Sequence, residues 1–226
     1  MNGFYYGPGM ILLIPALLIS LYAQAKVNSA FNKYLKVPSY SGYSGKDVAR
    51  MILDRNGLYD VNVVSIGGQL TDHYDPRSKV ISLSSNVYNG TSIAALSVAA
   101  HESGHAIQHG EGYFPLILRN NIAPIASISS RFVWIFIFLG FLISPILLEA
   151  GIILYLAIVL FQVITLPVEF NASNRALAQL ESGIITSNEA KPAKEVLSAA
   201  ALTYVAATLV AIGQLIRLIG LSNRRD

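Results

Sequence analysis

The sequence of 226 residues contains no cysteine. This absence excludes disulfide bonds, metal sites built on thiolates, and a cysteine nucleophile. Histidine is almost as scarce, because the chain has only His73, His101, His105 and His109. Any metal site must therefore combine a few of these imidazoles with the carboxylates of aspartate or glutamate.

Charge is also scarce. Charged residues make up 13% of the chain and hydrophobic residues 53%, and the mean hydropathy is +0.50. Soluble domains carry about 25% charged residues, so this composition predicts a membrane protein. The net charge is +3, and the basic residues are scattered rather than clustered. We therefore expect no nucleic-acid partner.

Long uncharged stretches predict the membrane helices. Residues 4–25 carry no charge and lack the basic start of a signal peptide, so we expect a retained helix. Residues 132–168 would form a helix of about 55 Å, against a hydrocarbon core of about 30 Å. This block predicts a helical hairpin that turns near Ser144-Pro145 or at 149–151. With residues 196–216, about four transmembrane helices are expected.

A polar region at 26–131 separates the first two of these stretches. Residues 44–56 fit a short helix that Ser44 or Asp47 begins, and Ser92 precedes a second, alanine-rich helix. Residues 61–66 and 79–84 have the composition of strands, with turn residues at 75–78. We expect a mainly α, polytopic membrane protein with a small α+β region that carries a short β-hairpin or sheet. Strand 79–84 has two equal alternatives: its edge pairs with an extended peptide, or it pairs with other strands in the core.

The distribution of lysine and arginine predicts the orientation. Six basic residues follow the first span and none precedes it, which places the polar region in the cytoplasm. The predicted organisation is transmembrane helix 1 at 1–25, a cytoplasmic region at 26–131, a transmembrane hairpin at 132–168, a cytoplasmic helix at 169–195, and transmembrane helix 4 with a tail at 196–226. Arg217, Arg224 and Arg225 follow the last span and contradict this scheme, so full crossing by that segment is left open.

The most informative motif is His101-Glu102-Ser103-Gly104-His105, which has the pattern H-E-x-x-H. Residues four apart on a helix lie on the same face, so both imidazoles can bind one ion. In zinc peptidases with this pattern, the glutamate between the histidines acts as the general base. The motif therefore predicts His101 and His105 as Zn²⁺ ligands and Glu102 as a catalytic base.

A catalytic zinc site takes a third protein ligand. His109 is a poor candidate, because eight residues of straight helix separate it from His101 by about 12 Å, whereas two ligands of one ion lie within about 4 Å. Glu169 is the best candidate, since it follows the second of two membrane crossings and so returns to the same face as the motif. Glu181 and Glu189 remain alternatives.

Three segments, in this order, resemble a known family. They are residues 70–77 (Leu-Thr-Asp-His-Tyr-Asp-Pro-Arg), residues 100–108 with the motif, and residues 166–176 with Glu169. The chain resembles the "putative neutral zinc metallopeptidases" of bacterial membranes, the YugP-type family. That family is similar in plan to a larger clan of membrane metallopeptidases with H-E-x-x-H and a distant E-x-x-x-D.

The resemblance implies a membrane-bound zinc peptidase in which His101, His105 and Glu169 bind Zn²⁺ and Glu102 is the base. It also implies a multi-pass protein of the bacterial inner membrane. One position departs from the larger clan: Ser173 stands where the clan has aspartate. No carboxylate is therefore expected at this position to hold a ligand histidine.

We therefore expect a metalloendopeptidase. Its expected partners are the lipid bilayer and a protein or peptide substrate. The substrate is expected to be a membrane or membrane-associated protein. A homo-oligomer or a regulatory membrane partner is left open. The alternative is a non-catalytic, metal-binding membrane scaffold or chaperone partner. A cation transporter would need acidic or histidine residues within the spans, and only Glu149 lies among them, next to the expected turn of the hairpin. Arg175, His73 and Tyr88 are eligible to stabilise an oxyanion, and the sequence does not select one of them.

Overall fold

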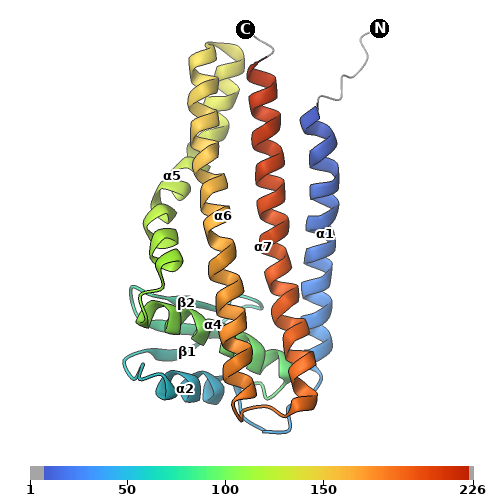
Figure 1. Ribbon diagram of the computed structural model, residues 1–226, viewed down its shortest axis with the longest axis vertical. Coiled ribbons are helices and arrows are strands. Elements are labelled where there is room, and N and C mark those ends of the chain that lie inside the picture. Colours follow the sequence, from blue (N-terminus) through green and yellow to red (C-terminus); the bar gives the residue numbers. More distant parts are fainter. Residues whose placement is uncertain (1–7, 224–226) are drawn as a thin grey trace. The chain divides into compact units, whose positions relative to one another are not determined.

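A computed structural model describes the backbone of residues 8–223 and the side chains of residues 13–223. The described chain is mainly helical and contains one small sheet (Figure 1). Its elements are α1 (Pro8–Leu35), α2 (Gly45–Arg55), β1 (Asn62–Ile66), β2 (His73–Asp75), β3 (Val80–Ser84), α3 (Ser85–Tyr88), α4 (Ile93–Gly110), α5 (Phe114–Leu142), α6 (Pro145–Glu181) and α7 (Ser187–Ser222). This composition confirms the mainly α prediction with a small sheet.

The chain divides into two compact units. Unit 1 comprises the chain up to Ala23, Ile117–Leu166, and the chain from Thr203 on. Unit 2 comprises Gln24–Leu116 and Pro167–Leu202. The complete H-E-x-x-H motif and Glu169 therefore belong to the same unit.

Three helices in the described part of the chain are long and apolar enough to cross a membrane: α5, α6 and α7. The break between α5 and α6 lies at residues 143–144, next to the expected turn at Ser144-Pro145. The expected first span begins at residue 4, and residues 4–7 lie outside the described residues. A count of four spans is therefore not confirmed.

The sheet of unit 2 has the strand order β1-β3-β2. Strand β1 runs parallel to β3, with Asn62 opposite Val80, and β2 runs antiparallel to β3, with His73 opposite Ser82. The β2–β3 turn falls where the Asp-Pro-Arg-Ser sequence predicted it. Of the two alternatives for strand 79–84, the structure shows core pairing, because β3 lies between β1 and β2 and offers no free edge. The described sheet ends at β1 and β2.

Helices α2 and α4 begin at the polar residues expected from the sequence. Ser44 Oγ accepts a hydrogen bond from Asp47 N at 3.2 Å, and the Asp47 carboxylate accepts one from Ser44 N at 3.0 Å. This reciprocal capping box satisfies backbone donors that the first turn leaves without a helical partner. Ser92 Oγ caps α4 in the same way, by accepting from Ala95 N at 3.2 Å.

Helix α4 lies in the hydrophobic core of unit 2. Leu96, Ala99 and Ala100 on α4 are inaccessible to solvent and belong to the same core cluster as the α2, β3, α6 and α7 side chains. Burial of each large apolar side chain stabilises the fold by roughly 1.5–3 kcal/mol. The small alanines let neighbouring backbones approach closely. The helix that carries the motif is therefore held on several sides.

Candidate metal centre

Three side chains of unit 2 converge on one point. His101 and His105 come from α4, and Glu169 comes from the part of α6 that belongs to unit 2. Glu169 Oε2 lies 3.3 Å from His101 Nε2 and 3.5 Å from His105 Nε2. One ligand atom from each residue lies within 4.8 Å of the other two. No other group of three or more histidine, aspartate or glutamate side chains with this property occurs in the described part of the chain.

The geometry of this group fits zinc. Tetrahedral Zn²⁺ binds nitrogen and oxygen ligands at about 2.0–2.2 Å, which places two ligand atoms about 3.3–3.6 Å apart. Both measured nitrogen–oxygen distances fall in that range. Two imidazoles and one carboxylate also form the three-ligand donor set of catalytic zinc sites, in which a water takes the fourth position. The residues present therefore suit a resident zinc ion.

Gly104 allows α6 to approach α4 at this point. A Cβ atom on Gly104 would lie 2.6 Å from Ala172 O, closer than any side chain can sit. Ala172 is three residues, or nearly one helical turn, after Glu169. The absence of a side chain between the two histidines thus lets the helix that carries Glu169 reach them.

We expect Gly104→Ala to destabilise the fold and to weaken zinc binding. Overpacking of this kind costs about 1–3 kcal/mol, and the better helix propensity of alanine offsets up to about 1 kcal/mol. Thermal unfolding and a zinc titration measure the two effects. Gly220→Ala is the control, because Gly220 is also helical and a Cβ there meets nothing within 4 Å. Equal behaviour of the two variants would contradict this role of Gly104.

Glu102 lies beside the three converging residues and is almost fully buried, with 8% of its surface exposed. Burial raises the pKa of the Glu102 carboxyl to about 7. The neighbouring His101 lowers the pKa of this carboxyl, while the nearby carboxylates of Glu169 and Asp72 raise it. Glu102 thus lies within electrostatic range of His101 and Glu169, on the same helix as the motif histidines.

The second nitrogen of each motif histidine also has a partner. Ser173 Oγ lies 3.2 Å from His101 Nδ1, and Gln108 Oε1 lies 3.0 Å from His105 Nδ1. Ser173 therefore contacts a candidate ligand histidine through a hydroxyl, from the position at which the larger clan has a carboxylate. Gln108 was not singled out from the sequence. Its spacing of three residues from His105 on the same helix was the available signal.

The alternative ligands lie elsewhere. His109 Nδ1 is 2.8 Å from Tyr74 Oη, and the buried Glu189 carboxylate accepts hydrogen bonds from Tyr40 N and Thr186 N. Glu181 is twelve residues after Glu169 on α6, which is about 18 Å along the helix. None of these side chains belongs to the converging group.

The three oxyanion candidates have different surroundings. The Arg175 guanidinium contacts Glu111 at 2.7 Å and Asn171 at 2.7 Å, so it is held in an ion pair and a hydrogen bond. The ring of Tyr88 lies under the Lys46 ammonium, at 5.6 Å from its centroid. His73 is exposed on β2, and it lowers the pKa of the Glu102 carboxyl.

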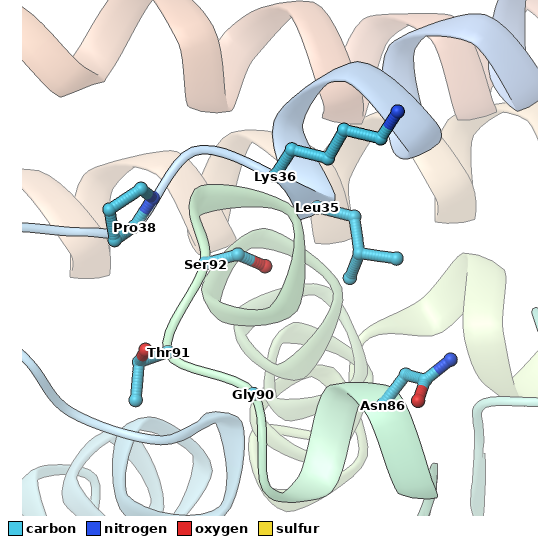
Figure 2. A pocket seen from close by; sticks show the side chains of 7 residues that line it. All are labelled: Leu35, Lys36, Pro38, Asn86, Gly90, Thr91 and Ser92. Atoms are coloured by element: carbon cyan, nitrogen blue, oxygen red, sulfur yellow. The ribbon is translucent and has the colours of Figure 1, made fainter.

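A cavity of about 330 Å³ lies between the end of α1 and the start of α4 (Figure 2). It is lined by Leu35, Lys36, Pro38, Asn86, Gly90, Thr91 and Ser92. Ser92 is nine residues before His101, or about 13 Å along α4. The hydroxyl of Ser92 is already bonded to Ala95 N. The cavity therefore contributes nothing to the candidate metal centre.

Comparison with known proteins gives two matches. The family model described as "Putative neutral zinc metallopeptidase" matches residues 9–223. A protein of Bacillus subtilis (strain 168) named "Putative membrane protease YugP" is 51% identical over 220 residues, which cover 96% of this chain and 98% of that protein. No solved structure matches the chain. The family match at residues 9–223 covers positions 101–105, 108 and 169 of this chain.

Proposed function

The chain belongs to the family described as "Putative neutral zinc metallopeptidase", as its three sequence segments predicted, and on this premise we propose that it is a zinc-dependent endopeptidase. The observation that carries the proposal is the convergence of His101, His105 and Glu169 within 4.8 Å, beside the buried carboxyl of Glu102. A purely structural metal site has no use for a buried carboxyl at that place. The name of the Bacillus subtilis relative supports the same class of activity.

In this proposal His101, His105 and Glu169 hold Zn²⁺. A bound zinc ion supplies a water of pKa near 7 and polarises the scissile carbonyl. Glu102 accepts a proton from the attacking water and then gives it to the nitrogen of the leaving amine. A carbon–oxygen bond forms and the carbon–nitrogen bond breaks, so one water is consumed and one carboxyl and one amine terminus appear. A positioned general base of this kind contributes about 10²–10⁴-fold to the rate.

The edge strand β2 is the proposed place for an extended substrate. In the described sheet β2 pairs only with β3, and it carries His73, which lowers the pKa of the Glu102 carboxyl. Unpaired backbone groups at a sheet edge bind extended peptides by adding a strand. This assignment replaces the prediction for strand 79–84, which lies in the middle of the sheet.

The proposed location is the cell membrane, with the metal centre on the cytoplasmic side and membrane or membrane-associated proteins as substrates. Helix α6 supports this proposal, because it contains both an apolar stretch long enough to cross a membrane and Glu169. The excess of lysine and arginine after residue 25 supports the orientation.

Removal of zinc tests the activity. We expect the purified full-length chain in detergent micelles to cleave an unfolded protein such as casein, to stop after treatment with a chelator, and to recover when one equivalent of Zn²⁺ is added back. Gel analysis and mass spectrometry of the fragments measure the cleavage. A chain with one bound zinc that cleaves neither casein nor a detergent-solubilised membrane protein would support the scaffold alternative instead.

A further inference from the structure

The side chain of Gln108 connects the two helices of the metal centre. It is fully buried on α4, and its Oε1 lies 3.0 Å from His105 Nδ1. Its Nε2 lies 2.8 Å from Val168 O and 2.9 Å from Asn171 Oδ1, both on α6. One end of the amide is thus hydrogen-bonded to a side chain of α4, and the other end is hydrogen-bonded to groups of α6. These two helices hold the candidate ligands.

The surroundings of this amide determine which end is which. Arg175 Nε can only donate a hydrogen bond, and it lies 2.7 Å from Asn171 Oδ1, so that atom of Asn171 is the oxygen. Asn171 Oδ1 and Val168 O are therefore two acceptors, and the group of Gln108 that faces both must be its NH₂. The reverse orientation would place the Gln108 oxygen less than 3 Å from two other oxygens, Val168 O and Asn171 Oδ1. Gln108 Oε1 consequently faces His105.

This orientation determines the protonation of one nitrogen of His105. Because Gln108 Oε1 can only accept, His105 Nδ1 must carry a proton whenever this hydrogen bond is made. The other nitrogen, Nε2, is then the one that can bind a metal, and it is the nitrogen that faces Glu169 at 3.5 Å. The hydrogen bond that one imidazole nitrogen makes sets the role of the other.

We propose that Gln108 is the positioning residue of the metal centre, and that its amide, oriented by Val168 O and the Asn171–Arg175 pair, fixes the tautomer and ring orientation of His105. Unlike the carboxylates that usually hold a ligand histidine, Gln108 adds no negative charge to the site. The orienting atoms lie on α6, so α6 both supplies Glu169 and directs His105. The inference rests on the metal site of the proposed function, but not on peptide hydrolysis.

His101 offers a contrast within the same site. Its Nδ1 faces Ser173 Oγ at 3.2 Å, and a hydroxyl can either donate or accept. Ser173 therefore does not determine the protonation of His101. The structure assigns the tautomer-fixing role to the pair of His105 and Gln108 alone.

Two substitutions separate the hydrogen bond from packing. Gln108→Met keeps the length of the side chain and removes the acceptor, so we expect zinc affinity to fall by about 10–100-fold, as for other partners of metal-binding histidines. Gln108→Glu keeps an oxygen that accepts from His105 Nδ1, but its second oxygen replaces the NH₂ that donates to Val168 O and Asn171 Oδ1. Its zinc affinity is therefore expected to fall less than that of Gln108→Met, although the fold is less stable. Ser97→Ala is the control, because it removes a buried hydrogen bond of α4 to Ile93 O away from the site.

The first readout is the dissociation constant of zinc. It is measured by competition with a chelating dye, on the full-length protein in micelles. Nitrogen-15 histidine NMR of the zinc-loaded wild type gives a second that requires no variant: His105 is expected to bind zinc through Nε2 and to carry a slowly exchanging proton on Nδ1. Wild-type affinity in Gln108→Met, equal losses in Gln108→Met and Gln108→Glu, or coordination through Nδ1 would overturn the proposal. Zinc binding with this NMR signature but without cleavage would overturn only the peptidase assignment.

Discussion

Substitution of Glu102 by glutamine is expected to leave zinc binding intact and to lower kcat/KM for peptide hydrolysis by about 10²–10⁴-fold. The amide has nearly the shape of the carboxyl, but it cannot take a proton from water. Glu102 is not one of the three residues whose ligand atoms converge, so its replacement removes no metal ligand. The neutral amide also places no new charge in a site where Glu102 is 8% exposed. Zinc content and cleavage rate must be measured on the same sample.

Glu181→Gln is the matched control for this variant. It makes the same chemical change at an exposed residue at the end of α6, about 18 Å along the helix from Glu169. Zinc content and cleavage are expected to equal those of the wild type. If Glu102→Gln cleaves at the wild-type rate, Glu102 is not the base. If it loses zinc, the residue has a role in metal binding that the geometry does not assign to it.

The second large effect is expected for Glu169→Ala, which should weaken zinc binding by more than about 100-fold. Loss of a residue that only orients a ligand costs about 10–100-fold, and Glu169 is proposed to be a ligand itself. Its removal leaves two imidazoles, His101 and His105, where three protein ligands are required for a catalytic zinc site. The dissociation constant, measured by competition with a chelator of known affinity, gives the result.

Two other glutamates control for Glu169. Glu181→Ala is expected to leave both zinc affinity and stability unchanged. Glu189→Ala is expected to lower stability without changing zinc affinity, because the Glu189 carboxylate accepts from Thr186 N at the start of α7 and from Tyr40 N. Unchanged zinc affinity in Glu169→Ala would contradict the proposed donor set, and a large loss in either control would move the third ligand elsewhere.

Local rules accounted for most of the helices but not for the sheet. The capping residues Ser44 and Ser92 mark the starts of α2 and α4 as expected, because capping depends on a few adjacent residues. Strand β1 pairs in parallel with β3, although β2 comes between them in the sequence. This pairing depends on contacts between residues that are distant in the sequence. Helix α5 begins at Phe114, well before the apolar block at residue 132, since hydropathy detects only the apolar part of a helix.

Some residues of the candidate site could likewise be predicted from the sequence, and others could not. The spacing of His101 and His105 predicts two candidate ligands because four residues make about one helical turn. Glu169 is 64 residues beyond His105 and could be singled out only by counting membrane crossings and by the family resemblance. The contacts of Gln108 and Ser173 with the histidines depend on how α6 is rotated against α4, and the close approach at Gly104 sets that distance. No sequence pattern reports such a rotation.

The central claim is that these three residues form one zinc site. Anomalous diffraction at the zinc absorption edge, from crystals of the zinc-loaded full-length chain, tests it most directly. The account predicts a single strong peak at about 2.0–2.2 Å from His101 Nε2, His105 Nε2 and a Glu169 carboxylate oxygen. A peak at His73 or His109, or a bound zinc that does not contact Glu169, would contradict it.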